Sequence, residues 1–120
     1  MGERSALQSC IDACTACAIA CTACARACAD ELDSDGLSKH LELNQDCTDI
    51  CHTTARLLSR QLHSFKFLRS QLETCALACA ACGIECRVHA DHERCRIAAA
   101  ACQRCEDACR KALRSLRASA

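Results

Sequence analysis

The chain of 120 residues has no proline, no tryptophan and no tyrosine, and its 15 basic side chains balance its 15 acidic ones. Proteins that bind nucleic acids use a basic surface for the phosphates and aromatic rings for stacking against the bases. Neither is available here, so we expect no nucleic-acid partner. Because the strongest helix breaker is also missing, long helices can run without interruption.

Export signals are missing as well. The first ten residues, MGERSALQSC, contain no apolar segment, twin arginine or cleavage site of the kind that directs secretion. The rest of the chain has no uninterrupted apolar run of the length that crosses a membrane. The sequence therefore predicts a cytoplasmic protein without a membrane partner.

The residues present in abundance are alanine, at 23 positions, and cysteine, at 16. In a secreted chain of this size so much cysteine would indicate a disulfide framework. The cytoplasm keeps thiols reduced, and clustered cysteines there are more typical of metal binding or redox chemistry. Two structural alternatives stay open: a metal-free core of thiols packed as small apolar groups, and disulfides formed between helices on oxidation.

The first cysteine cluster has the spacing of a helix seam. Between positions 10 and 28 the sequence reads CIDACTACAIACTACARAC, and successive cysteines are 4, 3, 4, 3 and 4 residues apart. This alternation places all six thiols on one stripe of a single α-helix. Most of the residues between them are alanine, the best helix former.

The remaining segments continue this pattern and predict four helices. We expect them over about residues 5–31, 37–61, 64–87 and 91–117, with Ser64 capping the third helix and Asp91 the fourth. Gly83, inside the third helix, indicates close packing with a neighbour. Four helices of similar length joined by short turns give an all-α, antiparallel up-down-up-down four-helix bundle. Its size is that of one domain, residues 1–120.

Cysteines on the seams of these helices face one another in the predicted core. The candidate metal ligands are Cys10, Cys14, Cys17, Cys21, Cys24, Cys28, Cys47, Cys51, Cys75, Cys79, Cys82, Cys86, Cys95, Cys102, Cys105 and Cys109. They come from the four helices as six, two, four and four, and together they line a central tube.

The two ends of this tube have different residues. One end collects leucines, namely Leu7, Leu58, Leu62, Leu68, Leu72, Leu113 and Leu116, with Phe65 and Phe67 nearby. The other end collects groups through which a metal ion could pass, namely His40, Asn44, His89 and His92 beside Cys28. Acidic residues at positions 30, 31, 33, 35, 91 and 93 surround it. We therefore expect a hydrophobic plug at the first end and an opening at the second, while His52 and His63 fall off the seams and should face solvent.

The softness of the ligands and their spacing favour Cu(I). Thiolates select Cu(I), zinc and iron–sulfur clusters. The four CxxC pairs lie in mid-helix, where two sulfurs on one face suit an ion of low coordination number, whereas zinc requires four ligands in a closed tetrahedron. Ferredoxin spacing, a CxxCH haem motif and the Glu-x-x-His pairs of di-iron bundles are absent. The cargo is therefore predicted to be several Cu(I) ions per chain. A zinc or general soft-metal buffer of metallothionein type is the main alternative, and a thiol redox sensor is another.

Four segments resemble the copper storage protein family, in its cytosolic branch. They are the CxxxCxxCxxxC runs of the first and third helices, CTDIC at 47–51 and ECRVHADHERCRIAAAACQRCEDAC at 85–109. The resemblance implies a cytosolic store of many Cu(I) ions, not an enzyme, and a homotetramer of bundles. Two features depart from the family pattern: Ala98 stands where relatives commonly carry a cysteine, and Asp91 and Arg94 stand where histidines are expected.

Overall fold

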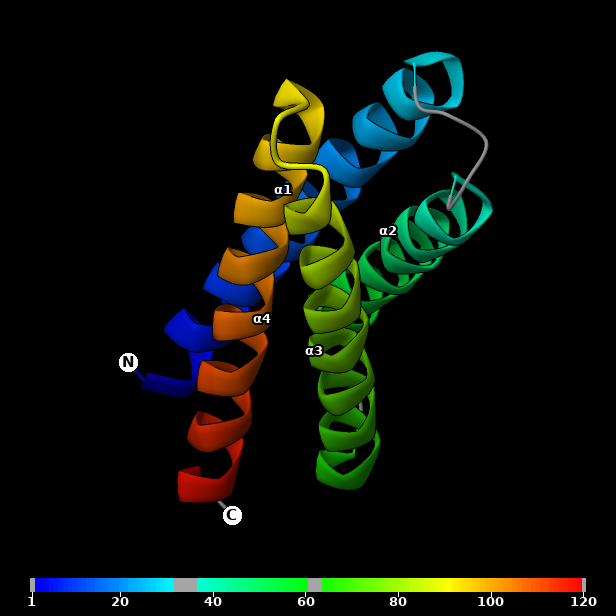
Figure 1. Ribbon diagram of the computed structural model, residues 1–120. Coiled ribbons are helices and arrows are strands. Elements are labelled where there is room, and N and C mark those ends of the chain that lie inside the picture. The colour runs from blue at the N-terminus through cyan, green and yellow to red at the C-terminus, as the bar shows by residue number, and fades with distance from the viewer. Residues whose placement is uncertain (1, 32–36, 61–63, 120) are drawn as a thin grey trace.

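The computed structural model describes residues 2–31, 37–60 and 64–119, and in these it contains four α-helices and no strand. The helices are α1 (Gly2–Glu31), α2 (Leu37–Arg60), α3 (Phe65–Val88) and α4 (Glu93–Ser119), shown in Figure 1. Each lies close to its predicted range, so the all-α fold is confirmed.

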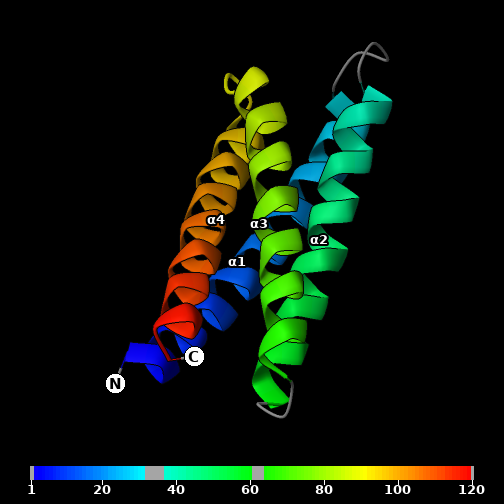
Figure 2. The same ribbon diagram turned by 90° about the horizontal axis from the view of Figure 1, so that it is seen from below.

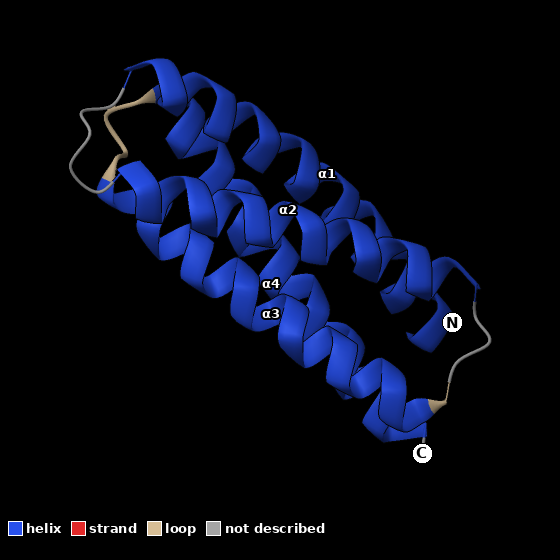
Figure 3. Cartoon of the chain, turned by 90° about the vertical axis from the view of Figure 1, so that its right-hand side faces the viewer, coloured by secondary structure: helices blue, strands red, loops and turns tan. Residues whose placement is uncertain are grey.

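The helices form an elongated bundle that measures 48 × 19 × 17 Å along its principal axes. Helix α1 packs against α2 and α4, and α3 packs against the same two helices, so the four surround one central axis. Figures 2 and 3 show that successive helices run in opposite directions and that the two termini lie at the same end. This is the predicted up-down-up-down arrangement.

One predicted helix cap is confirmed and the other is wrong. The hydroxyl of Ser64 accepts a hydrogen bond of 3.2 Å from the backbone N–H three residues later, as an N-cap does. Asp91 does not cap α4, because the helix begins at Glu93 and the carbonyl of His92 accepts its first hydrogen bonds. The guanidinium of Arg96 donates to two carbonyls of the preceding turn, at 2.9 and 3.3 Å, and holds that turn in place.

Leucine fills one end of the core, and cysteine is the main residue in the rest of it. The buried leucines are Leu58, Leu68, Leu72, Leu113 and Leu116, with Leu7 and Phe65 partly buried against them. Leu62 lies outside the described residues, and Phe67 is 46% exposed and adds little to this cluster. The hydrophobic plug expected at this end is confirmed.

Gly83 lets α3 and α4 approach each other closely, as its position predicts. A Cβ atom built on this residue would lie 3.3 Å from the Cβ of Cys102, tighter than ordinary van der Waals contact. A larger residue would therefore require the side chain of Cys102 to shift by a few tenths of an ångström in the middle of the thiol core. This explains why a glycine is tolerated in mid-helix, where it costs about 1 kcal/mol relative to alanine.

Helix α1 is apolar over most of its length, although no uninterrupted apolar run was expected there. Its segment Arg4–Asp30 is long and apolar enough to cross a membrane by length and composition, with a mean hydropathy of 1.4 in its most apolar window. The mean hydropathy is high because cysteine and alanine, which make up most of this segment, both count as apolar. They are small, and polar residues interrupt them. The bundle buries 33% of that window. The outer face of α1, which includes Ile19 at 64% exposure, is therefore also apolar.

Candidate metal centre

All sixteen cysteines point toward the axis of the bundle. Because their spacing of three and four residues repeats on each helix, they occupy the inward stripes of α1, α2, α3 and α4, and each has 0% of its surface exposed. All are free thiols. The core of the bundle is thus a column of sulfur enclosed by the helices.

Contacts between sulfur atoms connect thirteen of these thiols into one network. Neighbouring Sγ atoms in it are 3.6 to 4.0 Å apart, and most contacts join different helices. The members are Cys10, Cys14, Cys17, Cys21, Cys47, Cys51, Cys75, Cys79, Cys82, Cys86, Cys102, Cys105 and Cys109. An ion placed anywhere along the column would therefore meet thiols from more than one helix.

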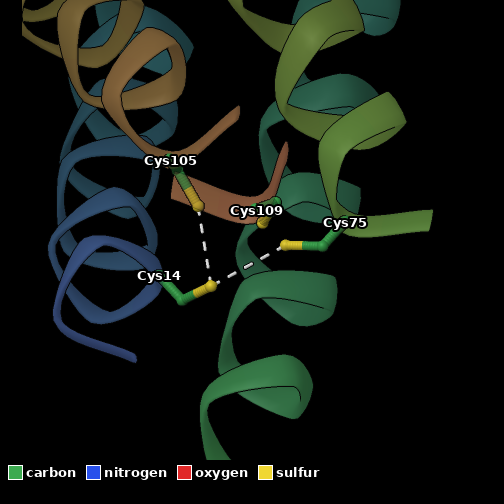
Figure 4. Close-up of side chains that lie close together, drawn as sticks. All are labelled: Cys14, Cys75, Cys105 and Cys109. Carbon is green, nitrogen blue, oxygen red and sulfur yellow. Dashed lines mark hydrogen bonds between the residues drawn. The ribbon is translucent and has the colours of Figure 1, made fainter. Parts of the chain in front are cut away.

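Sets of four thiols in this network are arranged as metal sites. In Figure 4, Cys14 of α1 lies 3.6 Å from Cys105 of α4 and 3.8 Å from Cys75 of α3, measured between Sγ atoms. With Cys109 they form a group whose four sulfurs all lie within 4.8 Å of one another. A tetrahedral zinc ion, with Zn–S distances of about 2.3 Å, would hold its sulfurs about 3.8 Å apart. This group, drawn from three helices, therefore has a spacing that zinc could also accept, so a zinc buffer stays an alternative to Cu(I).

His40 reaches the thiol column at the end opposite to the leucines, the open end, which also carries Cys24, Cys28 and Cys95. Its side chain is fully buried. The Nε2 atom lies 3.5 Å from the Sγ of Cys24 and 3.8 Å from that of Cys95. Cys28 completes the group, in which the imidazole nitrogen and the three sulfurs lie within 4.8 Å of one another. His40 was expected at an opening, and the structure places it inside the core.

Asn44, one turn further into the bundle, is also fully buried. Its Nδ2 donates to the Sγ of Cys24 at 3.5 Å. Its Oδ1 accepts from the thiols of Cys82 and Cys86, at 3.3 and 3.7 Å. The amide therefore bridges the three thiols near His40 and the network of thirteen.

Glu85 is a residue at this end that the sequence pattern did not single out. Its Oε2 lies 3.0 Å from the Nε2 of His89 and 3.5 Å from the Nδ1 of His40, and its side chain is 12% exposed. The two imidazole rings meet edge to face, with centroids 4.9 Å apart. The spacing of four residues between Glu85 and His89 on α3 could have indicated the pair.

The other residues expected near the opening are less buried than His40 and Asn44. His89 and His92 are half-buried, and the acidic residues at positions 30, 91 and 93 are exposed. His52 is exposed, as predicted. The side chains of Glu31, Asp33, Asp35 and His63 lie outside the described part of the chain.

Burial raises the pKa of some thiols, and hydrogen bonds from neighbouring thiols lower the pKa of others. At the open end, burial raises the pKa of Cys95 to about 12. Near the leucines, hydrogen bonds first from Cys109 and then from Cys14 lower the pKa of Cys10 to about 5. The same two neighbours lower the pKa of Cys105 to about 7. Some thiols therefore ionise by accepting hydrogen bonds from others that keep their protons, and metal binding must release those remaining protons.

Comparison with known proteins shows which family this core belongs to. The sequence profile of the copper storage protein family matches residues 3–114. The solved structure of Ccsp, a copper storage protein from Streptomyces lividans loaded with 10 copper equivalents, has a TM-score of 0.91 and 45% identity, and covers 95% of this chain and 88% of that one.

Two further relatives agree with this match. A structure of a cytosolic copper storage protein from Streptomyces lividans carrying five coppers has a TM-score of 0.89 and 46% identity, over 93% of this chain and 95% of that one. The cysteine-rich protein YhjQ of Bacillus subtilis (strain 168) is 35% identical over 103 residues, which are 86% of this chain and 92% of YhjQ. With matches that span nearly its whole length, the chain belongs to the copper storage protein family.

Proposed function

We propose that this protein stores many Cu(I) ions in the cytosol, bound by the thiolates that line its core. The observation that carries the proposal is the network of thirteen buried thiols, in which neighbouring Sγ atoms are 3.6 to 4.0 Å apart. Thiolates are soft ligands that select Cu(I), and each sulfur in such a column has neighbours on both sides with which to share an ion. The Streptomyces lividans relatives, described as cytosolic and as carrying five coppers or 10 copper equivalents, support this assignment.

All sixteen cysteines act as copper ligands in this proposal. If each ion took two thiolates of its own, they would hold about 8 ions, and if thiolates bridged they would hold up to about one ion per cysteine. We expect a count in the upper half of this range, because contacts within and between helices give 14 of the sixteen thiols at least two sulfur neighbours.

Storage requires no catalytic step, and we propose that the protein is not an enzyme. Among the described residues, the buried polar side chains are His40, Asn44 and Thr54. Thr54 is occupied by hydrogen bonds, donating to the carbonyl of Ile50 at 2.7 Å and accepting from Gln71 at 2.9 Å. The other two belong to the thiol column itself.

Copper passes through the end that carries His40, Asn44, His89 and His92. Imidazole and amide groups bind Cu(I) more weakly than thiolate, so they can pass ions to the core without retaining them. In the described part of the chain the leucine end is filled by apolar side chains such as Leu58 and Leu72, which offer a metal ion no ligand. The histidines thus affect the rate of loading, and the cysteines set the capacity.

We also propose that copies of the bundle assemble into a homotetramer. Large apolar residues are exposed along two outer faces: Ile19 and Ile97 beside the groove between α1 and α4, and Leu77, Ile84 and Val88 along α3. Apolar surface that continues over several turns is typical of contacts between proteins. Light scattering of the purified protein tests this assembly, and a monomeric mass would contradict it.

A metal-exchange experiment separates copper storage from its alternatives. A zinc buffer with sixteen thiols would bind about four ions, four ligands to each. A thiol redox sensor would show one or two labile disulfides with a defined potential. We expect excess Cu(I), supplied without oxygen to the zinc-loaded protein, to release the zinc and give a luminescent product without d–d absorption. Because Cu(I) displaces zinc from thiolates in either case, the count decides: more than about 8 copper ions per chain support copper storage, and a plateau at about four or fewer favours the zinc buffer.

A further inference from the structure

The four potential ligands at the open end differ from every thiol-only set in the core. Cys24, Cys28 and Cys95 contribute three sulfurs, and His40 contributes an imidazole nitrogen. All four residues are fully buried. A donor set of three thiolates and one imidazole is one of the common combinations in structural zinc sites.

Five of the six distances within this group are close to the edges of a tetrahedron around zinc, and the sixth, from His40 to Cys28, is within 4.8 Å. The three sulfur pairs are 3.8, 3.6 and 3.4 Å apart. The Nε2 of His40 lies 3.5 Å from Cys24 and 3.8 Å from Cys95. Bond lengths of about 2.3 Å to sulfur and about 2.0 Å to nitrogen would give edges of about 3.8 and 3.5 Å. The group therefore needs little rearrangement to enclose one ion.

The carboxylate of Glu85 lies on the side of the His40 imidazole that faces away from the sulfurs. Its Nε2 faces the sulfurs, while its Nδ1 lies 3.5 Å from the Oε2 of Glu85. That contact is within ion-pair range but does not have the geometry of a hydrogen bond. The same Oε2 interacts with His89 at 3.0 Å, which keeps the carboxylate in place. Histidines that bind metals commonly turn their second nitrogen toward such a carboxylate.

Two residues interrupt the sulfur lining between this group and the rest of the core. Asn44 places its amide between Cys24 on one side and the thiols of Cys82 and Cys86 on the other. On α4, the fully buried Ala98 leaves no thiol between Cys95 and the next cysteine seven residues later. The group can thus fill as a mononuclear site, unlike the thiols of the extended network.

From these observations we infer that Cys24, Cys28, Cys95 and His40 form a site for one Zn²⁺ ion in the copper-free protein. The site uses three of the thiols that bind copper in the loaded protein, but its occupation by zinc does not depend on copper. Glu85 is a positioning residue, because it contacts the imidazole and not the ion. Copper outranks zinc at nitrogen and sulfur sites, so the zinc ion belongs to the protein before copper arrives.

Cobalt(II) is a suitable probe, because it occupies zinc sites and its d–d spectrum distinguishes three sulfurs and one nitrogen from four sulfurs. One equivalent is added, without oxygen, to the reduced, metal-free full-length protein. We expect the spectrum of a tetrahedral site with three sulfurs and one nitrogen. It should change in His40→Ala and Cys28→Ser, and stay the same in Cys79→Ser, which alters the thiol-only sets, and in the exposed control His52→Ala.

Affinity gives a second readout for the positioning residue. Competition with a zinc chelator should show that Glu85→Gln lowers the affinity for the first zinc ion by about 10- to 100-fold. The cobalt spectrum of this variant should still be that of three sulfurs and one nitrogen. Far-UV circular dichroism shows whether each variant is folded. If His40→Ala does not fold, His40→Gln and X-ray absorption of the wild-type zinc protein give the same information.

The proposal is overturned if the spectrum of the first cobalt equivalent is that of four sulfur ligands. It is also overturned if that spectrum is unchanged in His40→Ala but changes in Cys79→Ser. Either result would place the first ion in the thiol network. Copper capacity, measured separately, could still reach its expected value in that case, so failure of the zinc site and failure of the copper store are distinguishable.

Discussion

The two ends of the bundle are held together by different chemistry. At one end Leu58 and Leu72 are almost completely buried, and each such side chain stabilises the fold by about 1.5 to 3 kcal/mol. At the other end the buried side chains are His40 and Asn44, whose partners are mostly thiols. The leucine end therefore maintains the fold, whereas the open end provides groups that can exchange one partner for another. A store needs both, because a bundle that loosens to accept metal must stay closed elsewhere.

The largest expected effect is on stability, from Leu72→Ala. The side chain is fully buried, and removing it leaves a cavity, so the free energy of unfolding of the metal-free protein should fall by about 2 to 5 kcal/mol. Urea denaturation measures the change. Leu77→Ala, on the same helix but 66% exposed, should stay within about 0.5 kcal/mol of the wild type. Equal losses in the two variants would show that the leucine end has no special role.

Replacing His40, His89 and His92 together by alanine should slow copper loading and removal by about tenfold or more. Capacity should stay nearly unchanged, because the sixteen thiols remain. Stopped-flow transfer from a chromophoric Cu(I) chelate measures the rates, with His52→Ala as the exposed control. Unchanged rates in the triple variant, combined with faster uptake in Leu72→Ala, would mean that copper passes through the leucine end instead.

The pH dependence of stability should also distinguish the two ends. Cys95, whose pKa is raised to about 12 from an ordinary value of 9.0, stabilises the fold below pH 9, and this contribution is lost as the pH rises toward 12. Cys10, whose pKa is lowered to about 5, contributes fully above pH 9 and loses that contribution as the pH falls toward 5. The thiols therefore favour maximum stability near pH 9.

Urea midpoints of the reduced, metal-free protein across this pH range test the prediction. The copper-loaded protein is the control, because its thiols are already deprotonated and its midpoint should not fall at alkaline pH. A metal-free midpoint that stays constant from pH 9 to pH 11 would contradict the role given to burial at Cys95.

The smallest expected effect is from Ala98→Cys, which restores a thiol between the open end and the network. Because Ala98 is fully buried, the new sulfur should join the column and raise the copper count by about one ion per chain. Metal analysis after gel filtration measures it. Ala100→Cys, at an exposed position of α4, should leave the copper count per chain unchanged. An equal gain in this variant would show that a thiol added at any position raises the count.

The sequence was sufficient to predict the helices, the inward direction of the cysteines and the leucine end. Each of these depends on spacing within one helix, which fixes the face on which a residue lies. The contacts between Cys14 and Cys105, or between His40 and Cys95, depend on how far two helices are rotated and shifted relative to each other. No spacing within one helix contains that information, and for this reason the zinc-compatible sets of four thiols were not expected.

Three details of the open end could not be predicted from the sequence either. His40 was expected at the opening, but it is buried in the core because its position on α2 faces Cys24 and Cys95. Glu85 gains its role only through the approach of α2 to α3, which brings it within 3.5 Å of His40. Asp91 has the residue type of a helix cap, but the turn that contains it ends one residue too late for that role.

The most direct test of copper storage in a preformed core is to count bound copper while following the fold. Reduced, metal-free protein is given excess Cu(I) without oxygen, separated from free metal and analysed for copper, with far-UV circular dichroism recorded before and after. We predict between about 8 and 16 ions per chain, in the upper half of that range, and a helical spectrum that is present before copper is added. A plateau at four or fewer ions, or a coil spectrum that becomes helical only with copper, would contradict the account.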